Sequence, residues 1–332
     1  MNSPNVTIRD IARIAGVSPG TVSRAFKSQQ GMSEETRTRV FEIADQLGYN
    51  RDNLRVRRLR RILFLLHKQH SSAHSNLFYS PVLHGVEDAC AEAGIALSFA
   101  SAGIDQNVAD LVRIHEPDAI ICAGYFEAEV LQAVIQCGLP LVMVDHFAAN
   151  VATINDDNVA GAYAAVQHLL ERGYKRIAFI SGPVSHYSIH LRERGYRKAL
   201  FDAGVLADPD YVTYYRDGLD QAEASALCAD QLLDLPNPPD AIFAFNDLTA
   251  LVALGRCQRR GLRVPEDIGI CGYDDIASAA TAHPSLTTVA VEKEALGREA
   301  VTWLLDATGT TLKSVHPVRL VIRESSLGPQ AR

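Results

Sequence analysis

The opening segment of this 332-residue chain constrains its fold most, because residues 7–26 have the pattern of two short helices joined by a tight turn. Gly16 can adopt the left-handed backbone that ends the first helix, and Ser18 with Pro19 suits the start of the second. A unit of this size has too little apolar surface to enclose an active site. It can, however, place one helix in the major groove of DNA.

A third helix is predicted to follow, with Ser33 as its cap and Gly48 at its end. Val22 and Tyr49 are expected to face the core of the resulting three-helix unit. The residues that this arrangement turns outward on the second helix are Pro19, Gly20, Thr21, Ser23 and Arg24.

Charge is divided unevenly along the chain. Residues 1–61 hold 12 Lys and Arg against 6 Asp and Glu, whereas the rest of the chain holds 20 against 33. A basic segment joined to an acidic body is typical of a protein that contacts the phosphate backbone with one part only. Six of the arginines fall between residues 51 and 61. They can form a solvated linker, but we favour contact with phosphates or the minor groove.

These segments carry a dense set of motifs. Residues 7–24 follow the pattern Thr-Ile-x-Asp-Ile-Ala-x-x-Ala-Gly-Val-Ser-x-x-Thr-Val-Ser-Arg, and Ser-x-x-Thr-Arg-x-x-Val and Leu-Gly-Tyr come after it. This resembles the N-terminus of the lactose-repressor (LacI/GalR) family of bacterial transcription regulators, densely over residues 7–49 and more loosely beyond. The resemblance implies a repressor that binds palindromic operator DNA as a homodimer and responds to a small-molecule effector.

By that resemblance, Pro19, Gly20 and Arg24 occupy base-reading positions, and only Arg24 has a side chain able to contact a guanine edge bidentately. Neighbouring hydroxyls would mostly contact phosphates. The family's hinge pattern, Tyr-x-Pro-Asn-x-x-Ala-Arg-x-Leu, is matched only if one extra residue is allowed, and Arg51 stands in place of its proline. The DNA-contacting residues expected from the resemblance are Thr7, Ser18, Pro19, Gly20, Thr21, Ser23, Arg24, Arg57 and Leu59.

The body of the chain alternates short apolar runs with helical patterns, which predicts parallel sheets covered by helices. The predicted strands form two sets: residues 62–66, 95–99, 119–122 and 141–144, then residues 176–180, 211–215, 241–245 and 268–271. The expected fold is an all-α three-helix helix-turn-helix head plus an α/β periplasmic-binding-protein-like body of two Rossmann-like lobes. The expected domains are a DNA-binding domain (1–50), a hinge (51–61) and an effector-binding and dimerisation domain (62–332).

Ligands of such sheets bind beyond the carboxyl ends of the strands, and those positions are unusually polar here. Family motifs support three of them: Arg192 in Arg-x-x-Gly-Tyr, Asn246 in Asn-Asp, and Asp274 in Gly-Tyr-Asp-Asp. A guanidinium with carboxylates and amides suits the vicinal hydroxyls of a sugar. The expected effector-binding residues are His67, Phe78, Tyr79, Tyr125, His186, Ser188, Arg192, Asn246 and Asp274.

Each of these assignments has a structural alternative. Phe78 and Tyr79 can simply pack at a helix start, and Asp274 can cap a turn. The histidines near residues 67–84 and 186–190 could bind zinc, but their spacing matches no compact zinc motif, so we expect direct hydrogen bonds to the effector, no metal and no cofactor. Lys68 and Arg192 keep a phosphorylated or acidic sugar open beside a neutral one.

Two classes of function compete. The first is a ligand-gated DNA-binding regulator, and the second is a cytoplasmic sugar-binding or sugar-processing protein with the same two lobes. We find no GxSxG, P-loop or HExxH motif and therefore expect no enzyme. The lack of a signal peptide and of a long apolar run favours a cytoplasmic, nucleoid-associated protein without membrane contact. By the resemblance, a leucine-rich tail makes some family members tetrameric; this sequence shows none, so we expect a dimer rather than a tetramer.

Overall fold

The computed structural model of the chain describes residues 8–26, 32–47, 49, 59–70, 77–183, 185–216, 218–306 and 312–328. The chain separates after Leu59 into two units, residues 1–59 and 60–332, which we call the head and the body. No helix in these described segments is long and apolar enough to span a bilayer.

The head is built from three helices, α1 (Ile8–Ala15), α2 (Pro19–Phe26) and α3 (Glu34–Gln46). Apolar side chains from one face of each helix pack together as its core. The ring of Tyr49 stacks on that of Phe26 with centroids 5.9 Å apart. Val22 is fully buried, so the predicted orientation of α2 is confirmed. The turn forms as its residues dictate, since Gly16 has a φ of +65° and the Ser18 hydroxyl accepts a hydrogen bond from the Thr21 amide at 3.1 Å.

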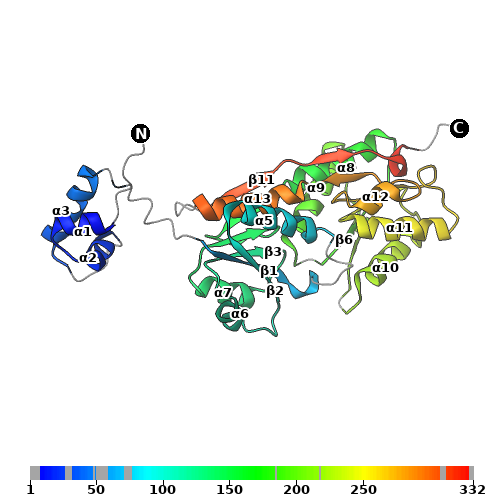
Figure 1. Ribbon diagram of the computed structural model, residues 1–332. Coiled ribbons are helices and arrows are strands. Elements are labelled where there is room, and N and C mark those ends of the chain that lie inside the picture. Colours follow the sequence, from blue (N-terminus) through cyan, green and yellow to red (C-terminus); the bar gives the residue numbers. More distant parts are fainter. Residues whose placement is uncertain are drawn as a thin grey trace. The chain divides into compact units, whose positions relative to one another are not determined.

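The first lobe of the body is a six-stranded parallel sheet in the order β11-β5-β4-β3-β1-β2 (Figure 1). Its strands are β1 (Arg61–His67), β2 (Ala96–Ala102), β3 (Ala119–Ala123), β4 (Leu141–Val144), β5 (Ala152–Asp156) and β11 (Lys313–His316). Its helices are α5 (Tyr79–Ala93), α6 (Val108–His115), α7 (Ala128–Gln136) and α13 (Lys293–Asp306), with a short 3-10 turn, η1 (Lys68–His70).

The second lobe is a four-stranded parallel sheet in the order β7-β6-β8-β9. Its strands are β6 (Ile177–Ser181), β7 (Val212–Tyr214), β8 (Ala241–Ala244) and β9 (Gly269–Cys271). Its helices are α8 (Asn158–Glu171), α9 (Tyr187–Asp202), α10 (Gln221–Leu233), α11 (Asp247–Arg259) and α12 (Ala277–Thr281), with the 3-10 turns η2 (Pro209–Tyr211) and η3 (Glu324–Ser326). An antiparallel pair completes it, β10 (Thr288–Ala290) with β12 (Arg319–Val321).

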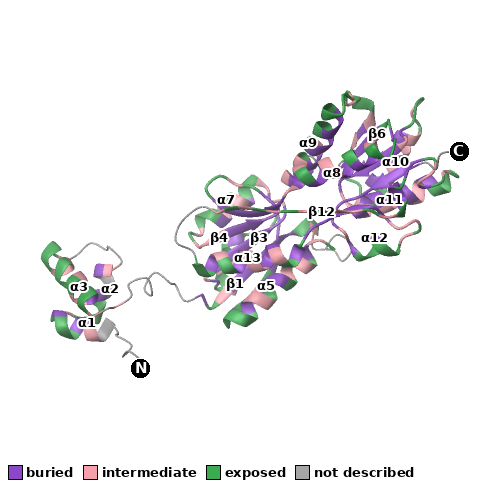
Figure 2. Cartoon of the chain, turned by 90° about the horizontal axis from the view of Figure 1, so that it is seen from above, coloured by how far each residue is buried: buried purple, intermediate pink, exposed green. Residues whose placement is uncertain are grey.

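The central strands of both sheets, β1, β3 and β4 in the first and β6 and β8 in the second, are buried, and purple strands in Figure 2 mark several of them. Leu63 and Leu65 of β1 pack into the core with residues of α6 and α7, and the alternate residues of β1 point to the opposite face. Two helix pairs approach closely because glycines face the partner backbone. A Cβ at Gly297 of α13 would lie 2.1 Å from the Val82 carbonyl of α5, and a Cβ at Gly195 of α9 would lie 2.4 Å from a carbonyl of α8.

The chain passes between the lobes three times, from β5 to α8, from β10 to α13 and from β11 to β12. Such short crossovers permit a hinge motion of one lobe against the other. The predicted fold is confirmed, and each of the eight predicted strands overlaps an observed one. A further strand-like run in the sequence, residues 318–323, overlaps β12, whereas no sequence pattern predicts β5, β10 or β11. The six cysteines are free thiols, five of them buried.

Candidate functional site

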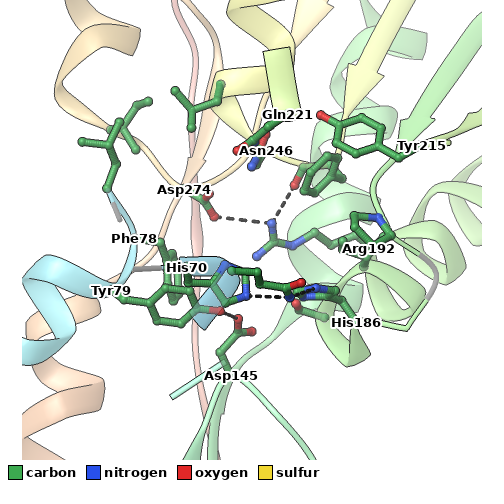
Figure 3. Close-up of a pocket in the computed structure, with 18 of the residues that line it drawn as sticks. His70, Phe78, Tyr79, Asp145, His186, Arg192, Tyr215, Gln221, Asn246 and Asp274 are labelled. Carbon is green, nitrogen blue, oxygen red and sulfur yellow. Dashed lines mark hydrogen bonds and ion pairs between the residues drawn. The ribbon is translucent and has the colours of Figure 1, made fainter. Parts of the chain in front are cut away.

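A cavity of about 400 Å³ is lined by residues from both lobes of the body (Figure 3). The first lobe contributes the η1 turn, the start of α5 and the residue after β4, while the second contributes α9 and the loops after β6, β7, β8 and β9. The side chains that carry its polar chemistry are Gln69, His70, Tyr79, Asp145, His186, Ser188, Arg192, Tyr215, Asp220, Gln221, Asn246 and Asp274.

The guanidinium of Arg192 lies at the centre of this pocket and is almost fully buried (Figure 3). Its Nε donates to Oδ1 of Asn158 at 2.7 Å, and its Nη1 donates to the carbonyl of Phe245 at 2.6 Å. Nη1 also forms an ion pair with Asp274 at 3.4 Å, and the guanidinium stacks on the Tyr273 ring, with 3.7 Å between Cζ and the ring centroid. Four neighbours therefore fix the side chain before any ligand arrives.

The acidic groups around Arg192 stabilise its charged form. Burial alone lowers the pKa of an arginine, but the carboxylate of Asp274 and its acidic neighbours raise the pKa of Arg192 above its ordinary value. Burial in turn raises the pKa of Asp274 to about 6, although Arg192 and Lys293 act in the opposite direction. Asp274 has a φ of +107°, and the Lys293 ammonium donates to its carbonyl, so a cation of α13 anchors this strained turn.

Asp145 supplies a second buried carboxylate, on the opposite side of Arg192 from Asp274 (Figure 3). The Tyr79 hydroxyl donates to Oδ2 of Asp145 at 2.7 Å. Among the described residues, Oδ1 of Asp145 has no hydrogen-bond partner, and Oδ1 of Asp274 has the ion pair with Arg192 at 3.4 Å but no hydrogen bond. Buried acceptors are normally satisfied, so Oδ1 of Asp145 is positioned to accept a hydrogen bond from a ligand, and Oδ1 of Asp274 can accept one beside its ion pair.

Asp145 should make the stability of the body depend on pH. Burial raises its pKa from 3.8 to about 7, and the nearby Asp156 carboxylate adds to the rise. The folded state therefore binds an extra proton between these values, and the resulting stability is full below about pH 4 and is lost as pH rises through about 7. Asp145→Asn should lose less free energy of unfolding than the wild type between about pH 5 and pH 8, measured by urea titration.

A matched control for this prediction is Asp105→Asn. Asp105 is exposed, and its hydrogen bond to Lys68 lowers the pKa of its carboxyl rather than raising it. This control variant should keep the wild-type loss of stability over the same pH range. An equally steep loss in Asp145→Asn would contradict the assignment of Asp145.

Two neutral imidazoles form another wall of the pocket. The side-chain nitrogen of Gln69 lies 2.9 Å from Nε2 of His186 and 3.2 Å from Nε2 of His70, so both rings can accept from one amide. Burial lowers the pKa of His70 to about 3 and that of His186 to about 4, which leaves both uncharged near neutrality. No group of three or more His, Cys, Asp or Glu within the described segments is arranged to hold a metal ion.

Comparison with known proteins decides the family. Residues 7–52 match the sequence family described as bacterial regulatory proteins, lacI family, and residues 166–326 match the periplasmic binding protein-like domain. The chain is 34% identical to the HTH-type transcriptional repressor CytR of Escherichia coli strain K12, over 90% of this chain and 89% of CytR. The chain belongs to the LacI family. It is a DNA-binding transcriptional regulator and not an enzyme.

Other relatives agree with this assignment. The regulator is 32% identical to the repressor PurR of Vibrio atlanticus, over 90% of this chain and 91% of PurR. The solved complex of the transcriptional regulator CelR with cellobiose has a TM-score of 0.72 and 30% identity, and covers 96% of this chain and 99% of CelR. The lac repressor dimer bound to operator has a TM-score of 0.70 at 23% identity, over 97% of this chain and 99% of that one, which supports the fold.

The pocket brings together seven of the nine effector-binding residues expected from the sequence, namely Phe78, Tyr79, His186, Ser188, Arg192, Asn246 and Asp274. His67 and Tyr125 do not line it. His67 Nε2 instead lies 2.9 Å from a carboxylate oxygen of Glu127. The Tyr125 ring packs on the ring of His186, a pocket residue, with centroids 5.2 Å apart, so Tyr125 contacts the pocket wall without lining the cavity.

Several pocket residues were not among the expected set. Asp145 directly follows a predicted strand, so its position carried a usable signal. Gln69 and Leu77 lie in residues 67–79, the polar segment that follows the first predicted strand, whereas Tyr215 and Leu219 follow β7 in a segment without a strong sequence pattern. One expected residue, Asn246, also has a structural role. Asn246 Oδ1 accepts from the Thr249 amide at 3.0 Å and caps α11, and the neighbouring Asp247 accepts from the Ile276 amide at 2.9 Å.

The predicted DNA-contacting residues all belong to the head, residues 1–59. Ser18, Pro19 and Gly20 are exposed at the start of α2, and Thr21 is partly exposed. Thr7 and Arg57 and the side chains of Ser23 and Arg24 lie outside the described residues. Leu59, expected as a minor-groove wedge, is buried in this structure, with 8% of its surface exposed.

Proposed function

We propose that this regulator is a dimeric, cytoplasmic repressor of palindromic operators whose affinity for DNA is set by a carbohydrate-derived effector bound between the two lobes of the body. The observation that carries the proposal is the buried Arg192, fixed between Asn158, the Phe245 carbonyl and Asp274 in a pocket lined by both lobes. A ligand that contacts both lobes changes their relative orientation only by binding one arrangement more tightly than the other.

The chemistry of the pocket supports a carbohydrate. Carboxylate oxygens, amides and a guanidinium surround its centre, and aromatic side chains such as Phe78 and Tyr79 form part of its wall. Sugars combine hydroxyl edges with apolar faces, and such a pocket meets both. CelR, which this chain resembles in sequence and structure, was solved with cellobiose.

The head supplies the DNA contacts in this proposal. We assign residues 1–50 to DNA binding, 51–61 to a hinge and 62–332 to effector binding and dimerisation. Exposed α2 residues and Arg24 would enter the major groove, and Arg57 and Leu59 would contact the minor groove. One recognition helix reads few base pairs, which is why a symmetric dimer on a palindrome is proposed.

Selection from random duplex DNA tests the proposal. The full chain should enrich palindromic sites, and a chain lacking residues 1–61 should enrich none while keeping the same affinity for the carbohydrate found by thermal-shift screening. Enrichment of no specific site by the full chain, together with retained carbohydrate binding, would favour a sugar-binding protein instead.

A further inference from the structure

The side chains of the pocket differ in depth. Its deep part, which we call the floor, is polar, and its solvent-exposed entrance, which we call the mouth, is apolar. Arg192 is 4% exposed, and Asp145 and Asp274 are each 7% exposed, so the charged groups are deep. Leu77 and Leu219, which line the same pocket, are 42% and 41% exposed. The two leucines therefore lie at the entrance, one from each lobe.

The floor is short of positive charge. Arg192 provides the one cation among the described lining residues, against the carboxylates of Asp145, Asp220 and Asp274. Lys293 lies beside Asp274 without lining the pocket, and its ammonium already donates to the Asp274 carbonyl. Asp156 adds a third buried carboxylate close by, where it accepts from the Tyr273 hydroxyl at 2.7 Å. Lys68, the other basic residue near this end of β1, pairs with Asp105 at 2.5 Å and does not line the pocket.

This balance selects against an anionic ligand. A phosphate or carboxylate entering the floor would add negative charge beside carboxylates in a dry environment, where like charges repel strongly. Oδ1 of Asp145 has no hydrogen-bond partner among the described residues, and Oδ1 of Asp274 has only its ion pair with Arg192 at 3.4 Å. Both can therefore accept hydrogen bonds, and the hydroxyls of an uncharged sugar can donate them.

The mouth favours an apolar ligand group, in contrast to the polar floor. Exposed leucines are unremarkable singly, but here two of them flank the entrance of a polar pocket, and Leu248 and Ile276 line the same cavity. A ligand group that covers them gains by removing apolar surface from water. The cavity of about 400 Å³ falls within the size range of small-molecule binding pockets, roughly 300–1,000 Å³.

We propose that the effector is an uncharged glycoside, with its sugar hydroxyls on Arg192, Asp145 and Asp274 and an apolar or aromatic aglycone between Leu77 and Leu219. The inference rests on the proposed carbohydrate effector. Of the three classes of sugar left open by the sequence, namely neutral, phosphorylated and acidic sugars, it selects the neutral ones. It adds the requirement for an aglycone.

Matched ligands test the class. Isothermal titration of the full chain would compare the free sugar, its phenyl glycoside, its terminal phosphate and its uronic acid, for glucose, galactose, mannose and ribose. For the sugar that binds, the phenyl glycoside should bind at least about tenfold more tightly than the free sugar, and the phosphate and the acid at least about tenfold more weakly. Tightest binding by a phosphate or an acid would overturn the proposal.

Variants at the mouth test the aglycone site. In Leu77→Ser/Leu219→Ser the affinity for the phenyl glycoside should fall about tenfold, to that of the free sugar, while the affinity for the free sugar stays unchanged. Leu206→Ser is the matched control, because Leu206 is 92% exposed and does not line the pocket. This control should keep the wild-type preference.

The outcomes separate this inference from the proposed function. If free sugars bind but the phenyl group adds nothing, or if the double variant keeps the preference, the aglycone site is wrong and the carbohydrate effector stands. If no compound of the panel binds the folded chain, the carbohydrate effector itself is wrong.

Discussion

Arg192→Ala is expected to abolish the response to effector while operator binding persists. The substitution removes the cation that fixes Asp274 and the donors to Asn158 and the Phe245 carbonyl, so the pocket loses both its charge balance and its geometry. Removing one partner of a buried ion pair costs about 3–5 kcal/mol of stability. We expect the affinity for the effector to fall at least about 100-fold, since charge-assisted hydrogen bonds contribute roughly 1.5–3 kcal/mol each.

Operator affinity should change little, because the head has its own core and forms a separate unit of the chain. Fluorescence anisotropy on a labelled operator, with and without effector, measures both quantities. Arg194→Ala is the control, since Arg194 lies on the same helix but is exposed. Wild-type effector affinity in Arg192→Ala would refute the assignment of this residue.

Arg24→Ala is expected to lower the affinity for the selected operator and to relax base preference at one position in each half-site. A bidentate contact between arginine and guanine contributes about 1–3 kcal/mol of discrimination, so a dimer should lose roughly twice that amount. Binding to random DNA should change little, because phosphate contacts dominate there. Quantitative selection on a library with that base pair randomised measures the preference directly.

The control for this prediction is Arg13→Ala. Arg13 is an exposed arginine of α1 with 77% of its side chain accessible, and it pairs with Asp10 at 3.6 Å. It should leave the base preference intact. An equal loss of affinity on operator and random DNA in Arg24→Ala would show that Arg24 contacts only phosphate.

The fold was predictable where strands are buried on both faces. Strands β1 and β3 consist almost entirely of apolar residues, the pattern of a parallel strand covered by helices. The sequence does not predict strand β5, because the strand ends in two polar residues, Asn155 and Asp156. Both are buried, since Asn155 donates to the His146 carbonyl at 3.1 Å and Asp156 accepts from Tyr273. Only tertiary partners make such a strand possible.

Strand β11 shows a second limit. Its four residues, Lys313–His316, alternate between exposed and partly buried and carry little apolar surface. They join the edge of the first sheet by pairing in parallel with β5, about half the chain away in sequence. A local sequence pattern cannot predict pairing between segments so far apart in the sequence.

The candidate site was predictable at strand ends and not elsewhere. Arg192, Asn246 and Asp274 sit in motifs that follow strands or begin helices, and all three line the pocket. His67 also ends a strand, but its side chain faces Glu127 behind the pocket wall, and sequence alone gives no orientation for the last residue of a strand. Leu219 lies in a loop whose path over the mouth depends on the packing of the second lobe.

We expect effector binding and operator binding to be coupled through the body. The most direct test is a pair of titrations on the full chain: the operator Kd with and without saturating effector, and the effector Kd with and without saturating operator. Coupling is reciprocal, so both ratios should be equal, and a functional regulator should show a ratio of about 5–150. An operator Kd unchanged by an effector that demonstrably binds would contradict the account.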